Sequence, residues 1–394
     1  MNVCFICFDF RKENVRRQPW KYVYEISQRL AQKGLEVVVI TDTFETELDG
    51  VRIRNVKKIS SPFGVREELV EAINEENPDV VITLLGITSF LSLYGLRERV
   101  NKPIIGILTS PIYSLREVMA VGAGEFIRHI NYLAIHIAGA LIPRFIIRKS
   151  AMQYDYIVTL SDENRKRLER IGVRSKLTTI RPGVNDGFPK PPIEEKVKKI
   201  REKINQDDLP LIMYFTSPLT LRGTDTLVRA FAKVRKTIPS KLLILSRLEH
   251  EELMKEERVL REIAIKGAIS DSVEILSEVL TPEEVKAYIS VADIISLPFK
   301  LVVSDVPVSI LESMALGKPV ISTRVASIPE MLEGRGIIVK PNDPEELCNA
   351  IIKLLEDREL CLKLGEESRK YMERYPQWGE SAEQFYKLIR ELVR

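Results

Sequence analysis

Hydrophobic positions in the first half of the chain follow two alternating patterns. Continuous apolar runs, each typical of a buried strand, occupy 2–8, 35–41, 80–85, 102–110 and 154–161. Between them apolar residues recur at helical spacing, and Gly34 and Gly172 stand where two of these helices would end. Continuous apolar strands that alternate with helices are typical of a parallel sheet covered on both faces.

The alternation stops once and then resumes. Residues 185–208 are first rich in Pro and Gly and then highly charged, which is typical of a linker followed by a surface helix. A second set of apolar runs follows at 210–216, 241–246, 273–278, 294–299, 318–323 and 336–340. The chain is therefore predicted to be of the α/β class, with two Rossmann-like doubly wound parallel-sheet domains facing across a cleft.

The break places the domain boundaries. We expect an N-terminal domain over 1–190 and a C-terminal domain over 191–375. Residues 376–394 form a long amphipathic helix after the second sheet is complete, and we expect it to pack back on the N-terminal domain. Because ligands of such sheets bind at the carboxyl ends of the strands, the cleft between the domains is the expected site.

Charge and cysteine content narrow the class of protein. The 59 basic and 56 acidic residues nearly balance, which argues against nucleic acid as a partner. Cys4 and Cys7 have the spacing of a redox motif, but they lie in an apolar run, so we interpret them as core residues. The first residues have no basic region and no small-residue cleavage site. These features indicate a cytoplasmic protein.

The longest apolar stretch, residues 130–147, is interrupted by polar residues and a proline. It is a poor membrane-spanning candidate, since a spanning helix needs about 20 mostly apolar residues. A buried helix or a cleft wall is the favoured interpretation. Arginines and a lysine surround the stretch, so peripheral membrane contact through 128–149 is the alternative.

Glu312 lies in an otherwise apolar helical run, in the segment SDVPVSILESMALGKPVIS (304–322). Pro307 suits the first turn of this helix, so the backbone N–H groups of Val308 and Ser309 would be unpaired and form an anion site. Glu312 projects from the same face one turn later, where a carboxylate could accept hydrogen bonds from a ribose diol. The pattern fits a nucleotide, and equally a surface glutamate on a helix whose other face is core.

A family resemblance favours the nucleotide. The segments SILESMALGKPVIS, YFTSPLTLRGTDTLVRAFAKV (214–234) and VEILSEVLTPEEVKAYISVADIISLPF (273–299) resemble the nucleotide-sugar half of the retaining glycosyltransferases of the glycogen-synthase/sucrose-synthase-like superfamily, called family 4. The resemblance covers essentially all of the C-terminal domain and, more weakly, the N-terminal one. It implies the GT-B fold, with the donor on the C-terminal domain and the acceptor on the N-terminal domain.

The resemblance also implies roles for single residues. Glu312 matches the second glutamate of the family's Glu-x7-Glu motif, which binds the donor ribose, and Val308 and Ser309 match the amides on the diphosphate. Arg222 matches the basic residue that neutralises the donor phosphates. Two further positions match places where the family's backbone approaches the donor. Val279 matches the contact with the nucleotide base, and Gly183 lies in the matching interdomain turn.

Among the departures from the family pattern, two fall on side chains that contact the donor. The first glutamate of the motif, which contacts the transferred sugar, falls on Ser304, and the neighbouring Asp305 is the candidate substitute. A second phosphate-binding arginine falls on Ser217. We therefore expect Asp305 and Arg222 to act in catalysis, and Ser217 to line the donor site.

The implied activity is hexosyl transfer, with retention, from a nucleoside-diphosphate sugar to a sugar or lipid-linked hydroxyl acceptor. No Asp-x-Asp occurs in the sequence, so neither a metal nor a cofactor is expected. Three alternatives remain: a catalytically impaired nucleotide-sugar-binding or scaffolding relative, a GT-B epimerase, and a dinucleotide-dependent oxidoreductase. The last is disfavoured because no Gly-x-Gly-x-x-Gly follows either first strand.

Overall fold

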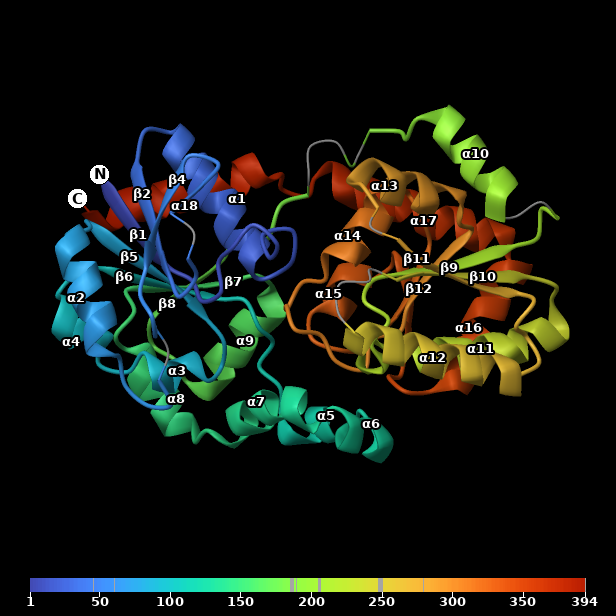
Figure 1. The fold of residues 1–394 in the computed structure, drawn as a ribbon, viewed down its shortest axis with the longest axis horizontal. Helices are drawn as coiled ribbons and strands as arrows, with labels where there is room; N and C mark the ends of the chain where they lie inside the picture. Colours follow the sequence, from blue (N-terminus) through green and yellow to red (C-terminus); the bar gives the residue numbers. More distant parts are fainter. Residues whose placement is uncertain are drawn as a thin grey trace.

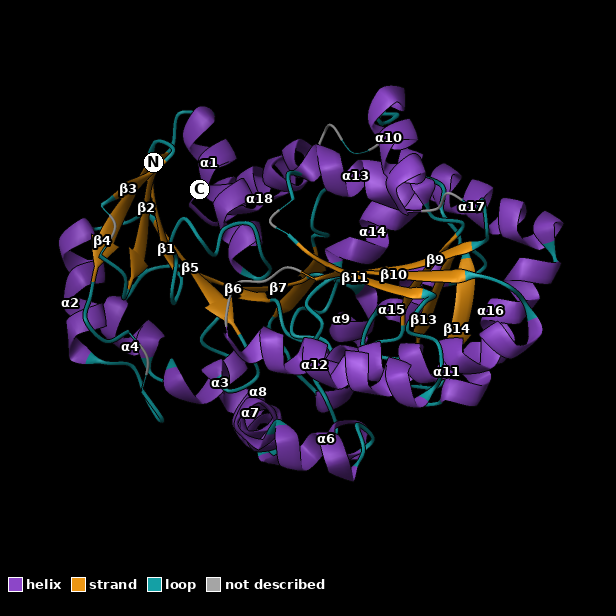
Figure 2. Cartoon of the chain, turned by 45° about the vertical axis from the view of Figure 1, so that its right-hand side comes forward, coloured by secondary structure: helices purple, strands orange, loops and turns teal. Residues whose placement is uncertain are grey.

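The chain forms two sheets that lie side by side, each with helices on both faces (Figures 1 and 2). The computed structural model describes residues 1–44, 46–59, 61–184, 188, 190–204, 207–246, 251–278 and 280–393. The first half of the chain supplies one sheet and the second half the other, with the segment around 185–208 between them. The predicted pair of doubly wound domains is confirmed.

The N-terminal sheet has eight strands in the order β3-β4-β2-β1-β5-β6-β7-β8. All neighbours are parallel except β3 and β4, and the register sets Val3 of β1 opposite Val37 of β2. The strands are β1 Asn2–Ile6, β2 Glu36–Thr41, β3 Glu47–Leu48, β4 Val51–Asn55, β5 Val80–Leu85, β6 Ile104–Leu108, β7 Tyr156–Thr159 and β8 Lys176–Thr179. Its helices are α1 Trp20–Gln32, α2 Glu67–Glu76, α3 Ser89–Ser92, α4 Leu96–Val100, α5 Leu115–Met119, α6 Ala123–Arg128, α7 Ile130–Leu141, α8 Arg144–Ala151 and α9 Asp162–Ile171.

Both faces of this sheet are core. Phe5 on β1 and Cys7, which directly follows this strand, belong to one buried apolar cluster. Cys4 and Ile6 of β1 belong to the cluster on the opposite face. Cys4 and Cys7 have no exposed surface, and burial raises the pKa of both thiols. Their interpretation as core residues is confirmed.

The C-terminal sheet has six parallel strands in the order β11-β10-β9-β12-β13-β14. They are β9 Leu211–Phe215, β10 Lys241–Ser246, β11 Val273–Ser277, β12 Ile294–Leu297, β13 Val320–Thr323 and β14 Gly336–Val339. The helices are α10 Glu194–Ile204, the 3-10 turn η1 Thr220–Arg222, α11 Thr224–Thr237, α12 Glu251–Lys266, α13 Pro282–Val291, α14 Val308–Ala315, α15 Ile328–Leu332, α16 Pro344–Glu356 and α17 Arg358–Glu373.

The last helix, α18 Trp378–Val393, leaves the C-terminal domain and packs against α1 of the first (Figure 1). Tyr22 of α1 meets the rings of Trp378 and Phe385 edge-on, with centroids 5.7 and 6.0 Å apart. Lys33 pairs with Glu383 at 2.6 Å. Two connections thus join the domains: the one after β8 and the one before α18.

These two connections touch at Gly183. Val184 forms a parallel bridge with Gln377, and a Cβ on Gly183 would lie 2.2 Å from the backbone nitrogen of Trp378. Only glycine fits so close an approach of two backbones. The structure therefore gives Gly183 a packing function in the chain crossing, which is a different role from the donor contact that the resemblance implies.

The apolar stretch 130–147 is not one helix. It is divided between α7 and α8, which meet at an angle of 84° beside Pro143. In the part of the chain that the structure describes, no single helix is long and apolar enough to cross a membrane, and only this bent pair meets the length and composition criteria together. Leu133, His136 and Gly139 of α7 are buried, so one face of the helix is core.

Candidate functional site

The order of the C-terminal strands places a switch point between β9 and β12. From β9 the chain moves outward through β10 and β11 on one side, and then through β12, β13 and β14 on the other. The loops after β9 and β12 therefore diverge at the carboxyl ends of two neighbouring strands, which is where ligands bind in such sheets. Ser217 and Arg222 lie after β9, and α14 follows the loop after β12.

The loop after β9 holds Arg222 in a defined position. The Arg222 guanidinium donates a hydrogen bond to Thr216 Oγ1 at 2.7 Å, and the Tyr214 hydroxyl donates to the carbonyl oxygen of Ser217 at 2.7 Å. Gly223, at φ +80°, follows directly, and a Cβ there would lie 1.8 Å from the carbonyl oxygen of Pro298. The glycine thus lets the two loops of the switch point meet, with Arg222 at their junction.

Helix α14 separates a core face from an outward face. Ile310, Leu311 and Met314 are buried, whereas Val308, Ser309 and Glu312 are partly exposed. Pro307 is the N-cap of this helix rather than a residue of its first turn, and no side chain caps the helix start. The first-turn N–H groups of Val308 and Ser309 and the carboxylate of Glu312 therefore belong to one accessible face, as an anion and ribose site requires.

Arg222 lies close enough to α7 of the N-terminal domain for its charge to act on Tyr132. Burial raises the pKa of Tyr132, and the positive charge of Arg222 acts in the opposite direction on the same phenol. Tyr132 comes from α7 and Arg222 from the loop after β9, so the charge of Arg222 acts across the cleft. Val279, expected at the base of the donor, lies outside the described residues.

Asp305 lies in the contact between the two domains. It has no exposed surface, its backbone N–H donates to the Thr109 carbonyl oxygen at 2.8 Å, and the Ser161 hydroxyl donates to its carboxyl group. Burial raises the pKa of Asp305 to about 7, although the hydrogen bond from Ser161 opposes the shift. In this domain arrangement the Asp305 side chain is enclosed between the domains, and its contact with the transferred sugar stays a prediction. Ser304 beside it is also buried.

A buried charged cluster, which the sequence did not reveal, joins the domains on the α6 side. Lys300, with 1% of its side chain exposed, lies 2.8 Å from Asp225 and 3.4 Å from Glu125 of α6. Thr220 donates a hydrogen bond to Glu125 at 2.5 Å. Burial opposes the ionisation of Glu125, but hydrogen bonding to His129 and the charge of Lys300 outweigh it and lower its pKa to about 2.

Other contacts close the remaining length of the cleft. The Tyr113 hydroxyl accepts a hydrogen bond from the Val302 N–H at 2.9 Å. It donates a second one to the Val302 carbonyl oxygen at 3.0 Å. Glu330 of α15 accepts from the Glu163 N–H at the start of α9, at 2.9 Å, and pairs with Arg181 at 3.0 Å. The structure is therefore that of a closed pair of domains.

Two further observations concern other kinds of site. Within the described ranges, no three His, Cys, Asp or Glu side chains gather where they could hold a metal ion.

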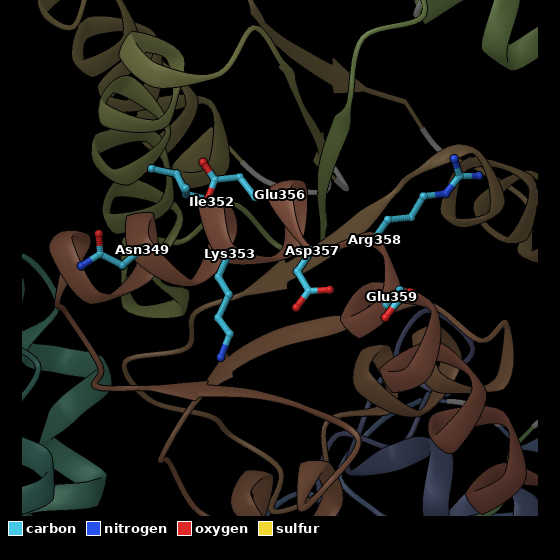
Figure 3. A pocket seen from close by; sticks show the side chains of 7 residues that line it. All are labelled: Asn349, Ile352, Lys353, Glu356, Asp357, Arg358 and Glu359. Atoms are coloured by element: carbon cyan, nitrogen blue, oxygen red, sulfur yellow. The ribbon is translucent and has the colours of Figure 1, made fainter.

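A shallow depression of about 490 Å³ lies at the junction of α16 and α17, where Lys353, Asp357 and Arg358 extend in different directions (Figure 3). Asn342, just before the start of α16, lies beside Gly122 of the N-terminal domain. The depression lies at the other end of α16, so it is not part of the cleft between the domains.

Comparison with known protein families gives a match in each domain. The Glycosyltransferase Family 4 model matches residues 20–188, and the model described as Glycosyl transferases group 1 matches residues 210–357. A GDP-mannose-dependent alpha-(1-6)-phosphatidylinositol monomannoside mannosyltransferase of Mycobacterium tuberculosis (strain CDC 1551 / Oshkosh) is 23% identical over 259 residues. The match covers 63% of this chain and 65% of that relative, just under two thirds of its length.

Solved structures share the whole architecture. Sucrose-phosphate synthase from Thermosynechococcus elongatus superposes with a TM-score of 0.75 at 20% identity, over 99% of this chain and 98% of that one. Anabaena HepE in complex with UDP superposes with a TM-score of 0.75 at 12% identity, over the full length of both chains. At these identities the likeness shows a common fold.

Proposed function

Because this chain belongs to the group 1 and family 4 superfamily of GT-B glycosyltransferases, we propose that it transfers a hexosyl group from a nucleoside-diphosphate sugar to a hydroxyl acceptor. The observation that carries the proposal is that the loop bearing Arg222 meets the loop leading to the uncapped start of α14, through Gly223 and Pro298, at the switch point of the C-terminal sheet. That junction offers a fixed cation and free backbone donors where a diphosphate would bind.

In the proposed donor site Arg222 and the N–H groups of Val308 and Ser309 hold the diphosphate. Glu312, one turn along the same face of α14, accepts hydrogen bonds from the ribose hydroxyls. Ser217 lines the same loop as Arg222, but its hydroxyl supplies no positive charge. The structure of HepE with UDP supports a nucleotide ligand in this fold.

Asp305 is left out of the proposed site because the closed domains bury it completely. Its contribution is to the contact between the domains, through Ser161 and Thr109. The positioning and electrostatic work therefore falls on Arg222 and on α14.

The proposed reaction retains the configuration at the anomeric carbon and uses neither metal nor cofactor. The bond from the anomeric carbon to the diphosphate oxygen breaks, and the bond to the acceptor oxygen forms on the same face of the sugar. The acceptor's proton passes to the departing diphosphate, whose negative charge Arg222 and the start of α14 stabilise. Holding donor and acceptor in this geometry supplies the remaining acceleration, and the closed domains exclude water.

The proposed acceptor is the hydroxyl of a sugar or of a lipid-linked glycan. The mycobacterial relative named for a phosphatidylinositol mannoside acceptor supports a lipid-linked one.

The test is release of nucleoside diphosphate from UDP-, GDP- and ADP-sugars with sugar and lipid acceptors present. We expect turnover with at least one donor, and a fall of at least about tenfold in kcat/KM for Arg222→Ala, the loss of one charge-assisted contact. Arg201→Ala, which removes an exposed arginine on α10, is the matched control and should leave turnover unchanged. Binding without turnover across the panel would identify a non-catalytic relative instead.

A further inference from the structure

One face of α7 is apolar and exposed. Ile135 and Leu141 are 55% and 61% exposed, and Ile130 is 43% exposed. They share this face with Ala134 and Ala138, which are also exposed, and Asn131 is the one polar residue among them. Helices that cover a soluble core usually turn polar side chains outward, so this pattern is the reverse of the usual one.

The inner face of α7 is fixed, so the apolar face cannot turn inward. A Cβ on Gly139 would lie 2.1 Å from Cγ2 of Ile87, which means that the helix backbone lies directly against the N-terminal domain. Leu133 and His136 are buried on this side, and the His136 ring packs edge-on against Tyr113 at 5.5 Å.

Helices α6 and α7 lie along one edge of the molecule, outside both sheets, in two views (Figures 1 and 2). The neighbouring helices add further exposed apolar side chains: Ile127 of α6 is 78% exposed, and Phe145 of α8 is 61% exposed. We call the exposed residues Ile127, Ile130, Ile135, Leu141 and Phe145 the apolar ridge.

The ridge is accompanied by positive charge alone. Residues 126–154 contain Arg128, Arg144, Arg148 and Lys149, and no Asp or Glu. All four cations are exposed. The whole chain, by contrast, has 59 basic and 56 acidic residues, so this segment departs from the general balance.

Of the two carboxylates that border the segment, Glu125 pairs with Arg128 at 3.5 Å and is buried beside Lys300 in the contact between the domains. Asp155 pairs with Arg97 at 2.5 Å and accepts the N–H of Ile104 at 2.8 Å. The cations that the proposed docking surface uses are therefore Arg144, Arg148 and Lys149.

We propose that the apolar ridge docks on an anionic lipid bilayer, with α7 lying in the plane of the interface. The ridge side chains enter the boundary of the acyl chains, and Arg144, Arg148 and Lys149 contact the lipid phosphates. Exposed apolar residues flanked by Lys and Arg are the features of interfacial helices, and each cation near an anionic surface adds about 1 kcal/mol. At 12 residues α7 is too short to span a bilayer.

A second copy of this chain is the less suitable occupant of the ridge. Two copies facing each other through α7 would bring Arg144, Arg148 and Lys149 of both copies into one interface, and residues 126–154 supply no Asp or Glu to pair with them. Like charges so placed oppose association. An anionic bilayer satisfies the charge and the apolar surface together.

Flotation of the full chain with vesicles tests the proposal. We expect binding to vesicles of equal parts phosphatidylglycerol and phosphatidylcholine at low salt, and little binding to phosphatidylcholine alone. Ile135→Asp and Leu141→Asp should each reduce the bound fraction at least about tenfold, since each places a charge at the interface. The matched control is Leu362→Asp, which alters a leucine 65% exposed on α17 and should bind like the wild type.

The basic residues give an independent readout. The triple variant Arg144→Gln, Arg148→Gln, Lys149→Gln should lose most of its preference for anionic lipid and most of its salt dependence. Unchanged melting temperatures would show that all variants are folded, as expected for exposed positions.

Three results would overturn the proposal. The first is that the wild type fails to bind the anionic vesicles at low salt. The second is that Ile135→Asp binds them as well as the wild type does. The third is that light scattering shows a dimer, which Ile135→Asp converts to a monomer while vesicle binding stays the same. None of these measurements involves a sugar nucleotide, so their outcome is independent of the proposed transferase activity.

Discussion

At the scale of single residues, the proposed donor site depends on which face of α14 each side chain occupies. Sequence spacing alone placed Glu312 on the face of Val308, and the structure shows this face partly exposed and the other face buried. The spacing sufficed because residues four apart on a helix share a face. Asp305 could not be placed in this way, since its burial depends on Ser161 and Thr109 in the other domain.

The exposure of Glu312 leads to a prediction about its removal. Glu312→Ala should weaken binding of the cognate nucleoside diphosphate by about 1.5–3 kcal/mol, the value of a hydrogen bond to a charged group. The melting temperature should hardly change, because the core contacts of α14 come from Ile310 and Leu311. Calorimetric titration and thermal unfolding measure the two quantities. Unaltered affinity with a large fall in melting temperature would make Glu312 a structural residue.

Asp305 should make stability depend on pH. Its pKa is raised from 3.8 to about 7 in the folded protein. Below about pH 4 the carboxyl group is protonated in both states, so its ionisation contributes no penalty. Between about pH 4 and 7 only the unfolded chain ionises, so the folded state loses stability as the pH rises, and above about pH 7 the loss is constant.

The variant Asp305→Asn removes this titration. The melting temperature of the wild type relative to Asp305→Asn should therefore decrease steadily from about pH 4 to about pH 7. Thermal unfolding across this range measures it, with Asp271→Asn, at a 76% exposed side chain, as the control. A difference that does not vary with pH would show that Asp305 has an ordinary pKa.

At the scale of elements, local signals in the sequence predicted helix ends well. Gly172 ends α9 at φ +87°, as predicted, and Thr281 forms a capping box with Glu284 at the start of α13. Both depend on neighbours within a few residues. The break between α7 and α8 was not predicted, although Pro143 marks it, because the apolar run continues past the proline on both sides.

The contact between α6 and the C-terminal domain should be a major source of stability. Lys300→Met removes the buried cation that Glu125 and Asp225 share and leaves them only the more exposed Arg128 and Arg229, which should lower the free energy of unfolding by about 3–5 kcal/mol. Urea denaturation measures the change. Lys340→Met, at a side chain 64% exposed, should change it by no more than about 0.5 kcal/mol. Equal stability of the two variants would contradict the pairing seen in the structure.

At the scale of the whole molecule, the two doubly wound domains were predictable because each sheet is encoded by its own series of apolar runs, and the family resemblance then implied the GT-B fold. The closed interface was not predictable, since its partners, such as Tyr113 with Val302, are far apart in sequence and carry no common motif. The same limit applies to the charged cluster around Lys300. Such pairs become visible only when two domains are placed together.

The central claim is metal-free transfer with retention, and the configuration of the product tests it most directly. Proton NMR of the glycoside formed from an α-linked nucleoside-diphosphate hexose, with a chelator present, reports both transfer and stereochemistry. We predict an α-linked product on the acceptor and an unchanged rate with the chelator. A β-linked product, free hexose in place of a glycoside, or loss of activity in the chelator would contradict the proposed mechanism.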